Sequence, residues 1–263
     1  MGIVNLSGDS FSEGAKSSSN SAVSRACSLL EQGANILDLG AESTRPGAFE
    51  VPSEVEIARL IPVIKELKKI DSNVLISVDT RHAETAEAVL DNGATWINDV
   101  SMLRFSSQMA SVCAKYDAGL ILCHSRGTPE NMTNNLFHNY GTDLIATIKD
   151  ELTSASNLAI NSGVKKEKII FDPGFGFGKN NNQMWEMMKR ANEFSSLGKI
   201  LYGISRKSFL GKLVQEDEPI LRAGATLTAE LYLASKSAYI IRTHDVRALR
   251  QALIVQEKLN SFN

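Results

Sequence analysis

Short apolar runs recur along the chain, and a stretch long enough for a helix follows each of them. The runs occupy residues 1–4, 36–39, 74–78, 95–97, 119–122, 168–171, 200–204 and 239–241. Strands that are buried on both faces form continuous apolar runs of this length, whereas helices are longer and periodic. Alternating strands and helices predict right-handed crossovers and a parallel sheet. Eight such units favour a closed (β/α)8 TIM barrel, an α/β fold, over an open doubly wound sheet, which is the structural alternative.

Apolar stripes and end signals predict the helices between these strands. We expect helices over residues 21–32, 54–70, 83–92, 108–117, 143–161, 183–195, 220–235 and 246–259, and a short extra turn over 207–214. Gly33 follows the first helix, at a position where a left-handed residue commonly ends one. Ser53 and Glu56 have the spacing of a capping box, which predicts the start of the second helix.

Charge and composition exclude several classes of protein. The 263 residues carry a formal net charge of −2, which offers no basic field for nucleic acid, and no apolar run approaches the ~20 residues of a membrane span. Because about 250 residues make a typical barrel, we predict a single domain over residues 1–263. The chain does not begin with a signal-peptide pattern, and its three cysteines form neither a metal-ligand spacing nor a complete disulfide framework. We therefore expect a cytoplasmic enzyme with reduced cysteines.

Polar residues occupy the positions where the predicted strands end. They are Asn5, Thr44, Arg45, Asp79, Asn98, Asp99, His124, Asp172, residues 205–207 and residues 242–245. Active sites of TIM barrels lie at the C-terminal ends of the strands, so these side chains are expected to surround one shared mouth. This mouth is the predicted active site.

Asp79, Asn98 and Asp172 suit a flat ring that carries amide and amidine edges. Each of them follows a run of buried residues. A carboxylate accepts from paired N–H groups and an asparagine offers a donor and an acceptor, so the set can bind the edge of a pterin or a purine. The structural alternative is that each residue caps a helix or closes a turn, as Asp and Asn commonly do. The occurrence of three in equivalent positions favours a binding site.

A second group of candidates is cationic and indicates an anionic substrate or leaving group. It comprises Arg45, Arg206, Lys207, Arg242 and His244. Bidentate arginines and helix N-termini are typical of phosphate sites. Two alternatives remain for residues 205–208: an exposed basic loop ahead of a helix, and a Schiff-base lysine of the aldolase kind at Lys207. Nothing in the sequence indicates the desolvated pocket that would lower the pKa of that lysine.

Residues 172–179 combine three glycines with two phenylalanines. The segment lacks the Ser or Thr that follows Gly-Lys in a phosphate-binding P-loop, and its glycine spacing differs from that of dinucleotide-binding loops. We therefore predict a tight loop that turns an aromatic ring toward the mouth, where a flat ligand could stack.

Several sequence blocks resemble, in the same order, the signature blocks of dihydropteroate synthases. They lie at residues 1–5, 9–12, 42–48, 77–80, 97–100, 172–179, 205–208 and 242–246, and cover nearly the whole chain. The blocks Glu-Ser-Thr-Arg-Pro-Gly and Ser-Arg-Lys-Ser are the most specific of them. Pterin-binding relatives in methyl transfer share the Asp, Asn and Asp set but lack the anion-binding set found here.

The resemblance implies a folate-biosynthesis transferase that condenses 6-hydroxymethyl-7,8-dihydropterin pyrophosphate with para-aminobenzoate and releases pyrophosphate. It implies that the pterin is bound by Asp79, Asn98, Asp172 and Lys207. The pyrophosphate is expected to contact Asn5, Arg242 and His244. The implied aminobenzoate site consists of Thr44, Arg45, Pro46, Phe177, Lys207 and Ser208. Asn5 is expected to reach Mg²⁺, the implied cofactor, and Asp79, Lys207 and Arg242 are the expected catalytic residues.

The implied mechanism is a dissociative loss of pyrophosphate. Carboxylates stabilise the positive charge that develops on the pterin, and Arg242 with Mg²⁺ stabilises the negative charge on pyrophosphate. The arylamine then attacks an already cationic carbon, so no covalent enzyme intermediate is required. Two alternatives stay open: a pterin-dependent methyltransferase subunit, and a paralogue that binds pterin without turnover.

The family resemblance also implies a homodimer, for which residues 220–235 and 246–259 are the predicted contact. The loops over residues 6–19 and 40–51 are long for a barrel, and we predict that they close over the substrates, with Phe11, Glu13 and Arg45 meeting above the mouth.

A few residues depart from the family pattern. Ser7 and Gly8 replace the usual Thr-Pro, so the first loop is expected to be more costly to order. Thr243 and the immediate start at Met1, without the usual N-terminal hairpin, resemble the sulfonamide-insensitive branch. The end of the glycine loop, residues 176–179, instead resembles the drug-sensitive form.

Overall fold

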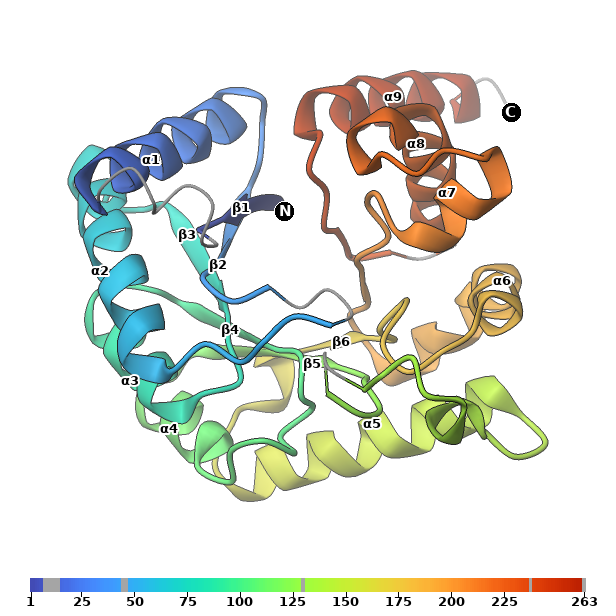
Figure 1. Cartoon of the computed structure of the whole chain (residues 1–263), viewed down its shortest axis with the longest axis horizontal. Coiled ribbons are helices and arrows are strands. Elements are labelled where there is room, and N and C mark those ends of the chain that lie inside the picture. Colours follow the sequence, from blue (N-terminus) through green and yellow to red (C-terminus); the bar gives the residue numbers. More distant parts are fainter. Residues whose placement is uncertain (7–14, 44–46, 129–130, 237, 262–263) are drawn as a thin grey trace.

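In the described part of the chain, eight parallel strands alternate with helices around a common axis (Figure 1). The computed structural model describes residues 1–6, 15–43, 47–128, 131–236 and 238–261. The strands are β1 (Gly2–Asn5), β2 (Ile36–Gly40), β3 (Leu75–Asp79), β4 (Trp96–Asp99), β5 (Gly119–Cys123), β6 (Ile169–Asp172), β7 (Leu201–Tyr202) and β8 (Ile240–Ile241). The helices are α1 (Ala15–Glu31), α2 (Ser53–Ile70), α3 (Ala83–Asp91), α4 (Met109–Lys115), α5 (Leu144–Asn161), α6 (Asn181–Lys189), α7 (Ser208–Val214), α8 (Ala223–Ala234) and α9 (Val246–Asn260).

Two hydrogen-bonded sheets join into a closed barrel. Strands β1 to β6 pair in chain order and β7 pairs with β8, all in parallel. Bridges from Phe171 to Ile200 and from Gly2 to Thr243 connect β6 with β7 and β8 with β1. The predicted (β/α)8 barrel is therefore confirmed, and the open-sheet alternative is wrong.

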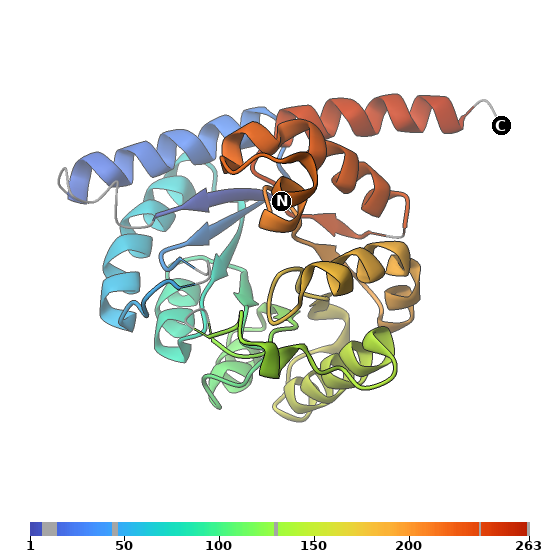
Figure 2. The same ribbon diagram turned by 45° about the vertical axis from the view of Figure 1, so that its right-hand side comes forward.

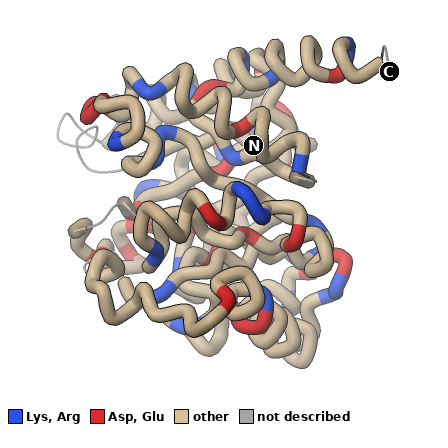
Figure 3. Tube along the Cα trace, turned by 90° about the vertical axis from the view of Figure 1, so that its right-hand side faces the viewer, with Lys and Arg blue, Asp and Glu red and all other residues tan. Residues whose placement is uncertain are grey.

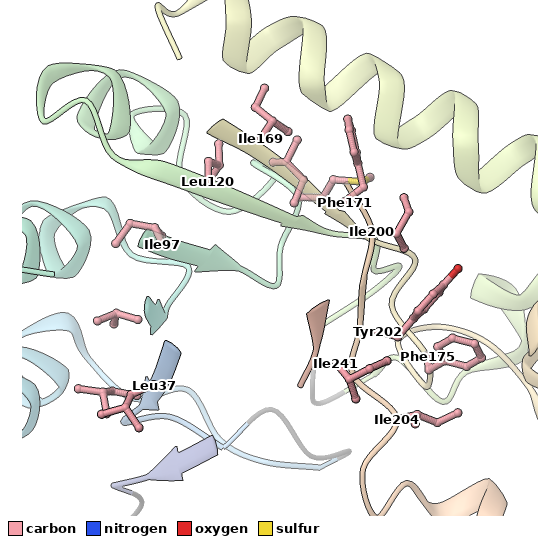
Figure 4. Packing of buried hydrophobic residues seen from close by; sticks show 14 of the residues in the cluster. Leu37, Ile97, Leu120, Ile169, Phe171, Phe175, Ile200, Tyr202, Ile204 and Ile241 are labelled. Atoms are coloured by element: carbon pink, nitrogen blue, oxygen red, sulfur yellow. The ribbon is translucent and has the colours of Figure 1, made fainter. Parts of the chain in front are cut away.

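Successive side chains of each strand lie in two different environments, as the period of a strand requires. Leu120 and Phe171 belong to the large apolar cluster of the molecule (Figure 4). Their neighbours Ile121 and Ile170 belong to a separate, small buried cluster. Alternate positions of one strand therefore face the surrounding helices or the interior of the barrel. The polar residues at the strand ends follow the same alternation.

The helices form an outer ring, as the turned view of Figure 2 also shows. Neighbours in the chain are neighbours in space: α1 packs on α2, α2 on α3, α3 on α4, and α8 on α9. Each helix covers a strip of the barrel wall with its apolar face; in α2 that face includes the buried Leu60, Ile64 and Leu67. This order follows from short connections between parallel strands, which place consecutive units side by side.

The predicted helices are present, but several of their bounds differ. α1 begins at Ala15, six residues before the predicted start at residue 21. The predicted helix over residues 183–195 is α6 followed by the 3-10 helix Ala191–Leu197, and that over 220–235 begins with the 3-10 helix Pro219–Arg222. The short turn predicted over 207–214 is α7.

The predicted capping box of α2 is wrong. Pro52 occupies the N-cap, and no side chain caps the helix there. The Glu56 carboxylate is instead fully buried and accepts hydrogen bonds from the hydroxyls of Thr80 at 2.7 Å and Thr85 at 2.8 Å. Two hydroxyls from a neighbouring unit of the barrel therefore outcompete the local backbone for this carboxylate.

Acidic and basic residues are interspersed along the trace in the view of Figure 3. Among the described residues, no helix combines the length and apolarity that a membrane span requires. The three cysteines are free, with Cys113 and Cys123 buried and Cys27 half-buried, as the sequence predicts.

Candidate active site

The strand register brings polar residues of neighbouring strands into one row. Asn5 pairs with Gly40, Gly40 with Asp79, and Asp79 with Asn98. A β-carbon at Gly40 would lie 3.6 Å from the β-carbon of Asp79, at ordinary van der Waals distance. The register therefore places the strand-end residues of β1, β3 and β4 in one row.

Arg242 lies at the centre of the buried polar network. Its Nε donates to Asp38 Oδ2 at 2.5 Å, and its Nη2 donates to Asp79 Oδ2 at 3.1 Å. Asn98 Nδ2 donates to the same oxygen of Asp38 at 3.2 Å. One guanidinium thus bridges two carboxylates from different strands, which fixes the positions of all four side chains.

Asp38 is a site residue that the sequence interpretation missed. It lies within the run 36–39, which was treated as apolar, and it is 0% exposed. Its strand neighbours Leu37 and Leu39 belong to the apolar cluster under the helices, so Asp38 faces the barrel interior. The available signal was a carboxylate inside an otherwise apolar strand, since a buried charge needs a partner.

The buried carboxylates have strongly altered proton affinities. Burial raises the pKa of Asp79 to about 8, although the Arg242 guanidinium opposes this rise. Burial also raises the pKa of Asp172, against the hydrogen bond from the Gly174 amide. Although burial opposes it, Asp38 and Asp79 raise the pKa of Arg242, which stays charged. The free site therefore holds a permanent cation beside carboxyl groups that ionise reluctantly.

Two acceptor atoms of this network lack a partner. Within the described residues, Asp38 Oδ1 and Asn98 Oδ1 are buried and make no hydrogen bond. Leaving a buried acceptor unsatisfied costs about 1–3 kcal/mol, so such atoms normally meet a ligand or water. A ring that presents N–H donors matches them.

The two phenylalanines of the glycine loop, residues 172–179 after β6, point in different directions. Phe175 is buried against Tyr202 and Phe209, with ring centroids 6.1 and 6.3 Å away. The ring of Phe177 instead lies 4.3 Å from Lys207 Nζ at the mouth. The prediction that this loop presents an aromatic ring to the mouth is consistent with this arrangement.

The backbone of the loop requires glycine. Gly174 has a φ of +71°, and a β-carbon there would lie 1.8 Å from the carbonyl oxygen of His124. The Gly174 amide donates to Asp172 Oδ1 at 2.7 Å, so Asp172 also closes a turn, as the structural alternative had it. The same carboxyl group thus fixes the loop and lies at the mouth.

Lys207 is more desolvated than the sequence indicated. Burial lowers the pKa of its ammonium, although nearby anionic groups such as Asp172 oppose the change. Nothing in the sequence indicated this desolvation. Lys207 is the N-cap of α7, whereas the predicted turn included it as its first residue; Ser208, the first residue of the helix, is exposed.

His244 and Arg206 lie on the segments that follow β8 and β7. His244 Nδ1 is 3.0 Å from Ser205 Oγ, which joins these two segments. Arg206 adopts a φ of +59°, and its carbonyl accepts from Arg222 Nη1 at 2.9 Å. The turn over residues 205–208 is therefore a fixed structure rather than a free basic loop.

The remaining candidates are not part of this network as far as the structure describes them. Thr44, Arg45 and Pro46 fall outside the described residues, as do Ser7, Gly8, Phe11 and Glu13 of the first loop. Asp99 closes a turn by accepting from the amides of Ser101 and Leu103, at 2.8 and 2.6 Å. His124 is buried beside Lys179, which the sequence interpretation did not single out.

A cavity of about 270 Å³ lies beside the mouth. Its lining includes Phe177, Arg81, Glu42, Ser125 and Arg126, which come from loops at the C-terminal ends of four strands. The Phe177 ring thus both lines this cavity and contacts Lys207.

The sequence of this chain is similar to those of known proteins. The sequence model of the family described as "Pterin binding enzyme" matches residues 1–244. A dihydropteroate synthase from Synechocystis sp. is 38% identical over 98% of this chain and 89% of its own length.

Solved structures are similar over almost the whole chain. A dihydropteroate synthase from Clostridium difficile, crystallised in the presence of pteroic acid, is 41% identical with a TM-score of 0.91, covering 98% of this chain and 95% of that one. The Yersinia pestis dihydropteroate synthase, in complex with a sulfonamide drug, is 33% identical with a TM-score of 0.91, covering 99% and 94%.

Replacing Asp38 tests the network through stability. Asp38→Leu leaves Arg242 with one carboxylate partner, and breaking a buried ion pair costs about 3–5 kcal/mol. We expect a loss of free energy of unfolding in urea approaching that range. The double variant Asp38→Leu with Arg242→Met should lose less than the single variant; an equal or larger loss would show that the two side chains are not coupled.

The raised pKa of Asp79 predicts a pH dependence of stability. The unfolded carboxyl loses its proton near 3.8, whereas the native one keeps it until about 8. The native state therefore binds more protons between these values, and the contribution of Asp79 to stability falls as pH rises through this window. Thermal unfolding of wild type and Asp79→Asn at several pH values measures this, and wild type should lose stability relative to the variant. Parallel curves would contradict the assignment.

Proposed function

The chain belongs to the pterin-binding enzyme family, with the sequence and fold of a dihydropteroate synthase, and from this premise we propose how its residues carry the reaction. The enzyme is a transferase that condenses 6-hydroxymethyl-7,8-dihydropterin pyrophosphate with para-aminobenzoate to 7,8-dihydropteroate in folate biosynthesis. The relatives are synthases, which favours this activity over a methyltransferase subunit or a paralogue without turnover.

The pterin site in this proposal consists of Asp79, Asn98, Asp172 and Lys207. The observation that carries it is a pair of buried acceptors, Asp38 Oδ1 and Asn98 Oδ1, which have no partner in the described part of the chain and lie beside two buried carboxyl groups. A pterin ring offers amide and amine N–H groups that would satisfy such atoms. Binding then favours the ionised form of the carboxyl groups, whose pKa burial raises.

The pyrophosphate site comprises Arg242, His244 and Asn5. Arg242 stays charged because two carboxylates face it, and Asn5 is exposed at the end of β1. No group of three or more His, Cys, Asp or Glu residues among those described could hold a metal alone. This fits Mg²⁺, which commonly takes one or two protein oxygens and completes its shell with phosphate oxygens and water. When bound, the ion would neutralise charge on the leaving pyrophosphate.

The aminobenzoate site is assigned to Phe177, Lys207 and Ser208, together with Thr44, Arg45 and Pro46 outside the described residues. Phe177 and Lys207 form a cation–π pair 4.3 Å apart, and Ser208 is exposed at the first turn of α7. An aromatic acid suits this set, because the ring can pack on Phe177 while cationic and N–H groups face its carboxylate. Sulfonamides, which bind the Yersinia relative, are expected to compete here.

The chemistry is electrostatic in this proposal. As the bond between the pterin methylene carbon and the pyrophosphate oxygen breaks, Asp79 and Asp172 stabilise the positive charge on the pterin, and Arg242 stabilises the departing anion. Lys207 and Phe177 hold the arylamine nitrogen in line with the cationic carbon. The amine loses its proton after the new C–N bond has formed. The catalytic residues are thus Asp79, Lys207 and Arg242.

We also propose a homodimer, whose contact keeps α8 from the two segments expected from the sequence, residues 220–235 and 246–259, but has α6 and α7 in place of the second segment. A groove of about 610 Å³ between α6, α7 and α8 is lined by apolar residues, among them Trp185, Leu213 and Tyr232. Leu213 is 63% exposed, which is unusual for a leucine beside other exposed apolar side chains. We propose that a second copy covers this face, and that the chain acts as a single cytoplasmic domain over residues 1–263.

Product formation tests the proposed function. Purified protein given both substrates and Mg²⁺ should form dihydropteroate and pyrophosphate, and EDTA should stop the reaction, since the phosphate oxygens then lose their counter-ion. Arg242→Ala should lower kcat roughly 100- to 1,000-fold, the usual effect of removing one transition-state donor. Arg190→Ala, whose guanidinium pairs with Glu186 and Glu193 at the surface, is the matched control. Product formation by wild type without Mg²⁺, or an Arg242→Ala rate equal to that of the control, would contradict the assignment.

Light scattering tests the proposed dimer. Wild type should have twice the 28.7 kDa mass of the chain, and Leu213→Glu should shift it toward the monomer because a buried charge at a contact is unfavourable. Leu158→Glu on α5 is the matched control, since Leu158 is 61% exposed and Leu213 is 63% exposed. A monomeric wild type, or dissociation by both substitutions alike, would refute this contact.

A further inference from the structure

Lys179 places a buried ammonium group inside the glycine loop. The residue is 5% exposed, and its Nζ donates to the carbonyl of Gly174 at 2.8 Å and to that of Phe177 at 3.0 Å. It also lies 2.9 Å from His124 Nδ1 and 3.3 Å from the His124 carbonyl. Lysine is almost never fully buried without a specific set of acceptors, so this cage indicates a defined role.

The hydrogen bonds of Lys179 fix the tautomer of His124. Burial lowers the pKa of Lys179 to about 7, and in its ammonium form the group can only donate, so Nδ1 accepts and the imidazole proton lies on Nε2. Nε2 is 3.0 Å from Glu151 Oε2, to which it therefore donates. Burial and the charge of Lys179 lower the pKa of His124 to about 3, so the imidazole is neutral. Arg104 Nη2 lies 2.8 Å from the same oxygen of Glu151, and Arg126 Nη2 pairs with the other oxygen, Oε1.

The same ammonium determines where the aromatic ring of the loop lies. The amide of Phe177 donates to the Gly174 carbonyl at 3.2 Å, so the two carbonyls that Lys179 holds belong to one turn. The Phe177 ring at the end of this turn packs on Lys207. Lys179 thus acts on the ring from inside the loop, without reaching the mouth itself.

The backbone of Asp172 is held by hydrogen bonds to β5 that do not involve Lys179. It pairs with Cys123 in the β5–β6 ladder, and its carbonyl accepts from the His124 amide at 2.8 Å. Loss of the Lys179 ammonium therefore leaves the strand end in place and the Gly174 amide bonded to Asp172 Oδ1, while the Gly174 and Phe177 carbonyls lose their shared donor. The consequences should differ between the two substrates.

We propose that Lys179 is a positioning residue of the aminobenzoate site, which holds the Gly174 and Phe177 carbonyls and thereby fixes the Phe177 ring against Lys207. This inference deepens the proposed function and rests on its assignment of Phe177 to that substrate. Glu151 and His124 are the outer members of the chain of hydrogen bonds that orients the ammonium.

The test compares two lysines on either side of β6. Lys179→Met removes the ammonium but keeps a long unbranched side chain. Lys168→Met is the matched control, because Lys168 Nζ donates to the backbone carbonyl of Asp117 at the opposite end of the strand. Initial rates are measured with each substrate varied in turn, and amide hydrogen exchange is followed in residues 174–178.

For Lys179→Met we expect the KM for para-aminobenzoate to rise by at least roughly tenfold, since a misplacement of about 1 Å can cost up to ~100-fold. The KM for the pterin pyrophosphate should stay within about twofold of wild type, and Lys168→Met should do so for both substrates. Exchange of the Phe177 amide should accelerate only in Lys179→Met. An unchanged aminobenzoate KM, or equal rises in both KM values, would overturn the proposal.

Two further variants keep the test decisive. If Lys179→Met does not fold, Lys179→Gln, which retains one polar donor, is judged by the same criteria. Phe177→Ala separates the two proposals: if it leaves the aminobenzoate KM unchanged, the site assignment itself is wrong. If Phe177→Ala raises that KM while the Lys179 variant does not, the role of Lys179 alone is refuted.

Discussion

The Arg242 guanidinium is the group on which the rest of the site depends. Asp38 and Asp79 come from neighbouring strands and are held away from water inside the barrel, where unpaired carboxylates would be too costly. Arg242 reaches both of them from the last strand and so couples the end of the chain to its beginning. Closure of the barrel through the bridge from Gly2 to Thr243 is what brings this side chain into range. Closure of the barrel and the pairing of its buried charges therefore depend on each other in this protein.

The same arrangement supplies the chemistry. A cation that is already paired with buried carboxylates stays charged and fixed, so it does not need to reorganise when an anion leaves. Asp79 ionises reluctantly in the free enzyme, whereas N–H donors and a developing positive charge on the pterin favour its charged form. The charges of the site therefore match those of the transition state better than those of the bound substrate. Such a difference accelerates the chemical step, whereas equal binding of both states would only tighten substrate binding.

Local patterns in the sequence sufficed for the barrel and for most strand-end residues, because buried strands leave continuous apolar runs. These patterns failed where residues distant in the sequence provide the hydrogen-bond partners of a side chain. Glu56 has the spacing of a helix cap, but hydroxyls of Thr80 and Thr85 from the next unit take its carboxylate. Asp38 was hidden in an apolar run, and its partner Arg242 lies at the far end of the chain. Lys179 shows its role only when the loop folds back onto β5.

Positional isotope exchange tests the central claim, which is that this charged interior ionises the pterin substrate, most directly. The substrate carries ¹⁸O in the oxygen between the methylene carbon and phosphorus, and it is incubated with enzyme and Mg²⁺ without the arylamine. If the C–O bond breaks reversibly, the label moves into non-bridging phosphate positions, which ³¹P NMR resolves. We predict such scrambling with wild type and its loss in Arg242→Ala. An enzyme that forms dihydropteroate but never scrambles the label would contradict the account, because the bond would then break only under attack by the amine.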